Sequence, residues 1–297
     1  MTDLDTLTAR FEVHRAHLRG VAYRMLGSVS EADDAVQEAW LRLARTDPAD
    51  VRNLGGWLTT VVSRVCLDLL RSRASRREDL VGLGQPGDYP DARPEADPEQ
   101  EALLVDEVGR ALLVVLDRLG PAERIAFVLH DMLAVPFGEI APVLDRTPAT
   151  TKKLASRARL RVRGTPAAGA ADLARHRQVV DTFLAASRAG DVDAIMAVLD
   201  PGVQRRADRA AIPAGRALQV RGARKVAEEI AVFGARARFA GPALVNGDVG
   251  VVVAPHGRLT LALAITIERG QITSYELIAE PARLARLELA TLDSWER

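Results

Sequence analysis

The chain has 297 residues, a length that predicts about two domains or three small ones. Hydrophobic residues make up 48% of it and charged residues 27%, the proportions of an ordinary globular protein rather than a disordered chain. The 40 basic residues balance 40 acidic ones, so any affinity for nucleic acid must come from how the charges are distributed.

The N-terminal residues lack the basic and then apolar profile of a signal peptide. The longest apolar run falls far short of the roughly 18 residues that span a bilayer. Cys66 is the single cysteine, which excludes an internal disulfide. We therefore expect a cytoplasmic protein with a reduced thiol.

Residues 11–78 are expected to form successive helices. Ser30 is predicted to cap one of them, with Asp33 three residues later in a capping-box pattern. An apolar stripe follows at helical spacing: Ala32, Val36, Trp40 and Leu43. Beside it lies a polar surface: Asp33, Asp34, Gln37 and Glu38. An acidic first turn is also what the helix dipole favours, so the pattern alone fits a partner surface or a solvated face.

A second long helix is expected from about Gly56. Its buried side is predicted to carry Leu58, Val61, Val62, Val65, Leu69 and Leu70. Residues 57–78 hold five arginines against two acidic residues, a net charge of +3. Arg64 and Arg71 lie near the face opposite the apolar one. A helix that faces DNA and an ordinary salt-bridged helix both fit this pattern.

The composition then changes over residues 79–105. Seven of the 17 residues in 82–98 are Gly or Pro, and residues 79–101 carry a net charge of −6. Such a stretch buries too little apolar surface to offset its ordering entropy, so it is predicted to be a linker.

Residues 137–163 match a helix-turn-helix. Thr147 is placed to cap the second helix, and Pro148 suits its first position because the missing N–H would be unpaired there. Leu154, Ala158 and Val162 form its apolar stripe. Residues 146–163 contain seven basic residues and no acidic one. A helix with one dry face and one cationic face favours binding in a DNA major groove, although a solvated basic helix has a similar pattern.

A hinge of small residues is predicted over 165–171, and the remainder changes class. Helices are expected near 172–188, 191–199 and 222–235, with strands in 243–254, 259–268 and 271–278. The strands are separated by turns at Asn246-Gly247-Asp248, Pro255-His256-Gly257 and Arg269-Gly270. The C-terminal part is thus predicted to be α+β.

Together these segments resemble the extracytoplasmic-function sigma factors of bacterial RNA polymerase. The likeness is carried by EADDAVQEAWLRL (31–43), GWLTTVVSRVCLDLLRS (56–72), PAERIAFVLHDM (121–132) and LASRARLRVR (154–163). It implies two all-α sigma domains, region 2 over residues 10–78 and region 4, with its helix-turn-helix, over 106–164. Residues 172–290 resemble the SnoaL-like cone domain fused to one branch of these factors, on the strength of 179–200, VRGARKVA (220–227) and Asn246-Gly247.

The resemblance assigns partners to particular residues. RNA polymerase core is expected to bind Asp33, Asp34, Gln37 and Glu38. The minus-ten promoter element is expected to meet Arg52, Asn53, Arg64 and Arg71. The minus-thirty-five element is expected to meet Thr150, Thr151, Lys152, Lys153, Arg157 and Arg161. In that branch the C-terminal domain is thought to control the sigma module, so we expect promoter-directed transcription initiation modulated by the chain's own C-terminal domain.

Two other functions fit parts of the sequence. A cone domain can be an enzyme, for which Asp208 and His256 are the visible acid–base candidates, but the sequence has no metal-ligand cluster, phosphate loop or nucleophile motif. We therefore expect no enzyme activity, no cofactor and no metal, and leave a small-molecule ligand of the cone open. A simple helix-turn-helix repressor would explain residues 137–163 but would leave 30–78 without a role.

Overall fold

The structure is a computed structural model that describes residues 3–46, 51, 53–81 and 109–292. It divides into two compact units. The first lies within residues 1–108 and 116–159, and the second within 109–115 and 160–297. Within the described residues, no helix combines the length and apolar character needed to cross a membrane.

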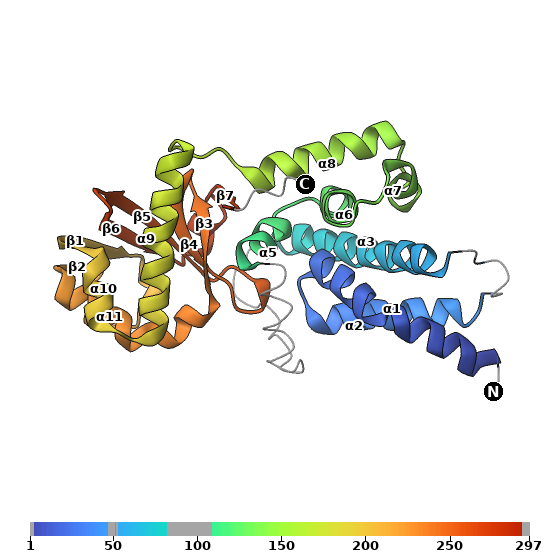
Figure 1. The fold of residues 1–297 in the computed structure, drawn as a ribbon, viewed down its shortest axis with the longest axis horizontal. Helices are drawn as coiled ribbons and strands as arrows, with labels where there is room; N and C mark the ends of the chain where they lie inside the picture. Colours follow the sequence, from blue (N-terminus) through green and yellow to red (C-terminus); the bar gives the residue numbers. More distant parts are fainter. Residues whose placement is uncertain (1–2, 47–50, 52, 82–108, 293–297) are drawn as a thin grey trace. The chain divides into compact units, whose positions relative to one another are not determined.

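Three helices begin the first unit: α1 (Asp3–Leu26), α2 (Val29–Leu43) and α3 (Leu54–Val81) (Figure 1). The predicted stripe on α2 is buried at Ala32, Val36 and Leu43, and Trp40 packs its ring against Phe11 at 5.1 Å between centroids. The predicted cap of α2 is wrong. Ser28 is the N-cap and accepts a hydrogen bond from the Glu31 N–H, whereas Ser30 already lies within the helix.

The rest of the first unit is also helical. Along the chain follow α5 (Arg110–Asp117), most of which belongs to the second unit, and then α6 (Pro121–Phe127), a π-helix η2 (Val128–Met132), α7 (Phe137–Leu144) and α8 (Pro148–Arg163). Helices α6 and α7 pack against α3. The helices α5 and α8 each cross the boundary between the two units, after Val115 and after Arg159 respectively.

The second unit is built on a seven-stranded sheet with the order β2-β1-β6-β5-β4-β3-β7. Among the strands that the structure describes, β1 and β6 pair in parallel and the other neighbours are antiparallel. The strands are β1 (Leu199–Ala207), β2 (Gln219–Arg221), β3 (Ala240–Val245), β4 (Asp248–Val253), β5 (Leu261–Glu268), β6 (Gln271–Ile278) and β7 (Leu289–Ala290). Together with its helices, the unit is the α+β domain that the sequence predicted.

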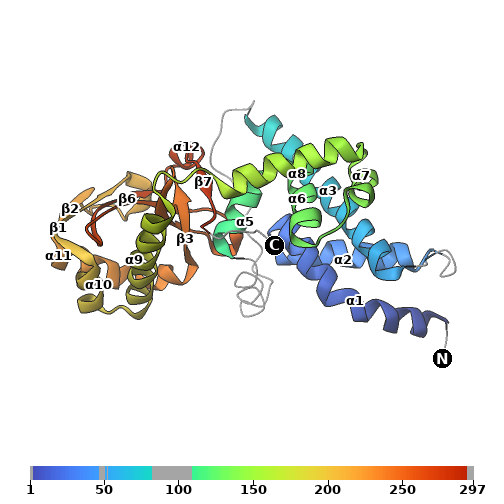
Figure 2. The same cartoon turned by 45° about the horizontal axis from the view of Figure 1, so that its top comes forward.

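Helices α9 (Ala170–Ala189), α10 (Val192–Val198) and α11 (Ala223–Phe233) gather on one side of this sheet (Figure 2). Helix α9 packs on β3 and β4, and α11 packs on β1. The core between helices and sheet contains Val180, Phe183, Ile195, Val226 and Tyr275. A short helix, α12 (Pro281–Leu284), follows the sixth strand.

Two of the predicted turns form tight hairpins. Asn246 and Gly247 both have positive φ, as do Arg269 and Gly270, and this left-handed pair matches the twist of the flanking strands. Close approach of strands explains Gly250, because a Cβ atom there would lie 2.4 Å from the Leu263 carbonyl oxygen. Strands β1, β2 and β7 were not predicted.

The two predicted connecting segments have different outcomes. Residues 79–81 of the expected linker belong to α3, and the rest of it lies outside the described residues. The expected hinge is attached to the second unit, since the Ala167 N–H donates to the Gly247 carbonyl at 2.8 Å. Its last two residues already belong to α9.

Candidate functional site

The turn of the helix-turn-helix contains one residue in the left-handed backbone conformation. Asp145 has φ 53° and ψ 47°, and its N–H donates to Ala141 at the end of α7. Asp tolerates this conformation better than most residues. Thr147 then caps α8 as predicted, because its Oγ1 accepts from the Thr150 N–H at 3.2 Å. Pro142 lies within α7 on an exposed position, and the helix continues past it.

Helix α8 presents a cationic face. Lys152, Lys153 and Arg157 are exposed, and none of their side chains has an ion pair or hydrogen bond to a described residue. The opposite face is dry, since Ala155, Ala158 and Val162 are buried. Free side-chain cations beside a rigid helix are suited to phosphate groups, because no internal carboxylate competes for them.

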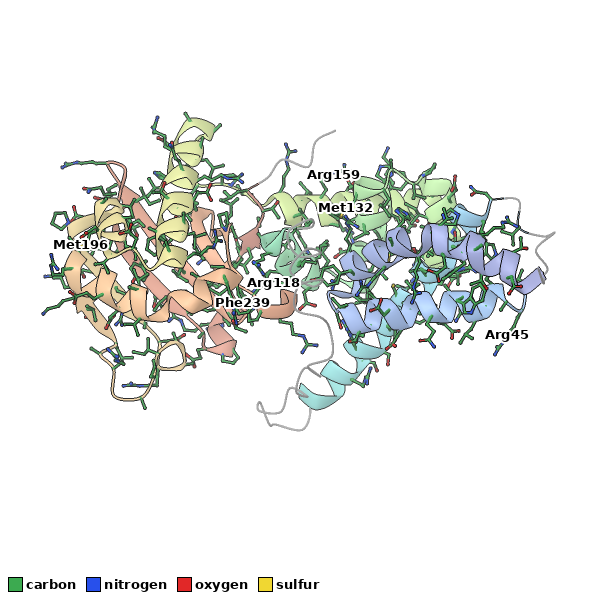
Figure 3. The ribbon with its side chains drawn as sticks, turned by 60° about the horizontal axis from the view of Figure 1, so that its bottom comes forward. Arg45, Arg118, Met132, Arg159, Met196 and Phe239 are labelled. Atoms are coloured by element: carbon green, nitrogen blue, oxygen red, sulfur yellow. The ribbon has the colours of Figure 1, made fainter. Side chains whose placement is uncertain are left out.

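Other predicted members of this surface lie differently. Thr151 is fully buried, and its hydroxyl donates to the Thr147 carbonyl at 3.0 Å. Thr150 is half-buried and occupied in the cap. Arg161 is exposed but interacts within the chain. Arg159 is one of the seven basic residues counted in the sequence, and it pairs with Asp131 of η2 at 2.5 Å. Figure 3 labels Arg159 and Met132, the residue that follows Asp131.

The acidic surface of α2 contains two kinds of residue. Asp33 pairs with Arg19 at 2.8 Å, and Glu38 pairs with Arg42 at 2.9 Å. Asp34 and Gln37 are exposed and have no partner among the described residues. The unpaired residues are therefore those most readily available to another protein.

The predicted minus-ten residues lie at the start and in the middle of α3. Asn53 caps this helix, because its Oδ1 accepts from the Gly56 N–H at 3.1 Å. Arg71 is exposed and has no partner among the described residues. Arg64 is exposed too, but it donates to the Pro142 carbonyl of α7 at 3.3 Å. Arg52 lies outside the described residues.

A buried arginine of α6 was missed from the sequence. Arg124 is 2% exposed and donates to the Arg24 carbonyl near the C-terminal end of α1 and to the Asp117 carboxylate. Its charge lies near the Cys66 thiol of α3, whose pKa burial raises to about 12. Nothing in the local pattern around Arg124 distinguishes it from an exposed helical arginine.

Asp208, the acid–base candidate whose side chain the structure describes, is held by backbone N–H groups. The Asp208 side chain is buried, and its carboxylate accepts from the N–H groups of Ala211, Ala279 and Glu280 at 2.8–3.0 Å. Its charge partner is Arg283 at 3.9 Å. Asp208 therefore joins the end of β1 to the end of β6.

The His256 side chain lies outside the described residues. Within the part of the chain that the structure describes, no three His, Cys, Asp or Glu side chains are grouped so that they could hold a metal ion.

Comparison with known protein families gives two matches. Residues 10–76 match Sigma-70 region 2, and residues 109–162 match Sigma-70, region 4. The two matches in this order define a sigma factor of the sigma-70 type. They also account for residues 30–78, which a simple helix-turn-helix repressor leaves without a role.

Curated relatives extend the likeness to the C-terminal unit. The probable ECF RNA polymerase sigma factor SigI of Mycobacterium tuberculosis is 36% identical over 287 residues, 96% of this chain and 97% of SigI. SigJ of the same organism is 40% identical over 293 residues, 92% of this chain and 91% of SigJ. A crystal structure of SigJ aligns at 34% identity with a TM-score of 0.46 over 94% of this chain and 98% of SigJ.

The chain belongs to the extracytoplasmic-function (ECF) RNA polymerase sigma factors. Its function is promoter-specific transcription initiation, with RNA polymerase core and promoter DNA as partners. The family is not enzymatic.

Proposed function

We propose that α8 is the helix that binds the minus-thirty-five element. The observation that carries this proposal is the exposed set Lys152, Lys153 and Arg157, free of internal partners on a segment without any acidic residue. Such cations bind phosphates and base edges without first breaking an ion pair. Thr150 lies at the N-terminal end of the same helix, where docked recognition helices contact DNA. The buried Thr151 contributes to the fold of the turn instead.

Site-specific crosslinking tests this assignment. A photoreactive amino acid replaces Lys153 in the full chain, and a second variant carries it in place of Lys225, an exposed lysine of α11. With core polymerase and promoter DNA, we expect crosslinks upstream of the start site from position 153 and none from position 225. Equal crosslinking from both positions would contradict the proposal.

We propose that the acidic surface of α2 binds the polymerase core mainly through Asp34 and Gln37. Both side chains are exposed and unpaired among the described residues, so binding needs no internal ion pair to break. Asp33 and Glu38 lie on the same surface, and their pairing with Arg19 and Arg42 holds them in place. Surface pairs of this kind are weak and can exchange for pairs with a partner.

We propose that minus-ten recognition uses Asn53, Arg64 and Arg71, together with Arg52. The contact of Arg64 with the Pro142 carbonyl supports a further step. An arginine that donates to α7 is not free for a DNA strand, and α6 and α7 both pack on α3. The arrangement of the first unit is then a closed form, and α7 must leave α3 before Arg64 meets the promoter.

We also propose that the C-terminal unit modulates the sigma module through α8. The protein acts in the cytoplasm, where promoter DNA lies. Residues 148–159 of this helix belong to the first unit and its last residues to the second. The Val162 carbonyl accepts from both the N–H and the hydroxyl of Thr291, at 2.9 and 3.1 Å. Gly164 follows with a φ of 60°, and a Cβ atom there would meet Ala290 at 2.4 Å.

These contacts attach the end of α8 to the second unit, so a change in that unit reaches the DNA-binding helix through continuous backbone. A Thr291→Val variant keeps the side-chain shape and removes the hydroxyl donor. We expect it to change the yield of run-off transcripts with core polymerase while promoter choice is retained. An unchanged yield over a range of promoters would contradict this modulation.

A further inference from the structure

A cavity of about 130 Å³ lies within the second unit, between α9, α11 and the sheet. Its walls are mostly apolar, with Phe183 and Leu184 from α9, Val251 from β4 and Leu263 from β5. An engineered protein cavity of about 150 Å³ with a similar lining is known to hold a benzene molecule. The volume therefore suits a ligand of about one ring.

Two charged side chains in the cavity wall, Arg205 and Glu229, form an ion pair with each other. Arg205 of β1 is buried and pairs with Glu229 of α11 at 2.5 Å, and it also donates to the Ala217 carbonyl at 2.8 Å. Because the guanidinium is held from two sides, the pair is a fixed part of the wall. The site does not offer Arg205 as a free cation.

Tyr275 of β6 is different. It is 5% exposed, it lines the cavity, and its ring packs on Phe183. Its hydroxyl makes no hydrogen bond to any residue that the structure describes. Burial raises the pKa of this hydroxyl, so it stays protonated and can donate. The hydroxyl oxygen itself is not fully enclosed, so a molecule in the cavity can reach it and accept its hydrogen bond.

The mouth of the cavity adds one positive charge. Arg216, in the segment between β1 and β2, lines the cavity and is exposed, with no side-chain partner among the described residues. Since Glu229 is paired with Arg205, the cavity has an excess cation at its entrance. An anionic ligand is favoured over a cationic one.

We propose that this cavity binds a small, mostly apolar molecule of about one ring that presents a single oxygen acceptor to the Tyr275 hydroxyl. The acceptor is a carbonyl or a carboxylate oxygen, and Arg216 at the entrance favours the carboxylate. The apolar body lies among the side chains of α9, β4 and β5. This ligand site is independent of the DNA and polymerase surfaces proposed above.

Binding to the full chain by calorimetry and ligand-observed NMR tests the proposal with three probes. Benzoate carries a carboxylate, acetophenone carries a neutral carbonyl, and toluene has no acceptor. We expect benzoate and acetophenone to bind one molecule per chain at least tenfold more tightly than toluene. Equal affinity for all three, or no binding at millimolar concentration, would overturn the proposal.

Two variants make the test specific. Tyr275→Phe keeps the ring and removes the donor, so the affinity for acetophenone should fall about tenfold while that for toluene stays the same. If acetophenone binds this variant as well as it binds the natural chain, the assignment of Tyr275 is overturned. Val251→Phe fills the cavity and should abolish binding of all three probes. Retained binding would place the ligand elsewhere and overturn the proposal.

A third variant separates the two acceptors. Arg216→Ala should lower the affinity for benzoate to that for acetophenone if the ligand is a carboxylate. If benzoate binds no more tightly than acetophenone to the natural chain, the ligand is a neutral carbonyl compound. Either result is compatible with a hydrogen bond from the Tyr275 hydroxyl to the ligand. Both are binding measurements, so they do not depend on the transcription activity of the protein.

Discussion

The helices α8 and α3 are both rich in basic residues, yet their cations are used differently. On α8, Lys152, Lys153 and Arg157 have no partner among the described residues. On α3, Arg73 pairs with Glu31 and donates to the Leu26 carbonyl, while Arg64 donates to Pro142. Helix α3 packs on one side against α1, α2, α6 and α7, whereas the cationic face of α8 is exposed.

The difference shows that positive charge on a helix is not by itself a measure of its affinity for nucleic acid. A cation that holds two helices together must give up that contact before it binds a phosphate. The absence of any acidic residue over 146–163 is the more informative feature, because it removes the local partners. On α3, the acidic and carbonyl groups of α2, α1 and α7 take up part of the charge.

The largest expected effect is on α8. Changing Lys153 and Arg157 together to Ala should weaken promoter binding tenfold or more and reduce the slope of log affinity against log salt by about two, roughly one per lost phosphate contact. Fluorescence anisotropy over a salt series measures both. The matched control is Arg224→Ala with Lys225→Ala, which removes the same charge from exposed positions of α11. A slope reduced equally in the control would mean that net charge, not α8, governs binding.

A second prediction concerns α2. Asp34→Lys reverses an exposed, unpaired charge and should weaken binding to polymerase core by about tenfold. The free energy of unfolding should change by about 0.5 kcal/mol or less, as is usual for surface changes. Thermal melts and core-binding titrations are compared on the same preparation. A parallel loss of stability and core binding would show that the helix is only structural.

A third prediction compares the two arginines of α3. Arg71→Ala removes a free cation, so we expect promoter melting to fall several-fold with stability unchanged. Arg64→Ala removes a cation too, but it also removes the hydrogen bond to the Pro142 carbonyl. That hydrogen bond stabilises the closed arrangement. We expect its loss in promoter melting to be smaller, because opening becomes easier as the DNA contact is lost. Permanganate footprinting of the minus-ten region measures the melted strand, and equal defects would argue against the closed form.

The smallest expected effect separates capping from recognition at Asn53. Asn53→Ala removes the cap of α3 and should cost about 1 kcal/mol of unfolding free energy. Asn53→Asp keeps the accepting oxygen and loses the amide donor, so stability should be retained while minus-ten binding falls. If Asn53→Asp binds promoter DNA normally, the amide has no part in recognition.

Much of the fold could be predicted from local pattern. The apolar stripes of α2, α3 and α8 follow helical periodicity, and the hairpins at Asn246-Gly247 and Arg269-Gly270 follow from turn chemistry. Strand β1 was not predicted, because Pro201, Gly202 and two arginines interrupt its hydrophobic alternation. Strands β2 and β7 are only three and two residues long, and so they carry almost no periodic signal.

The helical and α+β character of the two parts, the helix-turn-helix and the concentration of charge on α8 all follow from the amino-acid sequence. These properties depend on neighbours along the chain, such as caps, turns and side chains one helical turn apart. Which charges are free and which are paired depends instead on tertiary contacts. Three examples involve residues that are distant in the sequence, and no local pattern encodes them. Arg124 donates to the Arg24 carbonyl, and the Asp208 carboxylate accepts from the N–H groups of Ala279 and Glu280. The Tyr275 hydroxyl lies beside the cavity without a partner among the described residues.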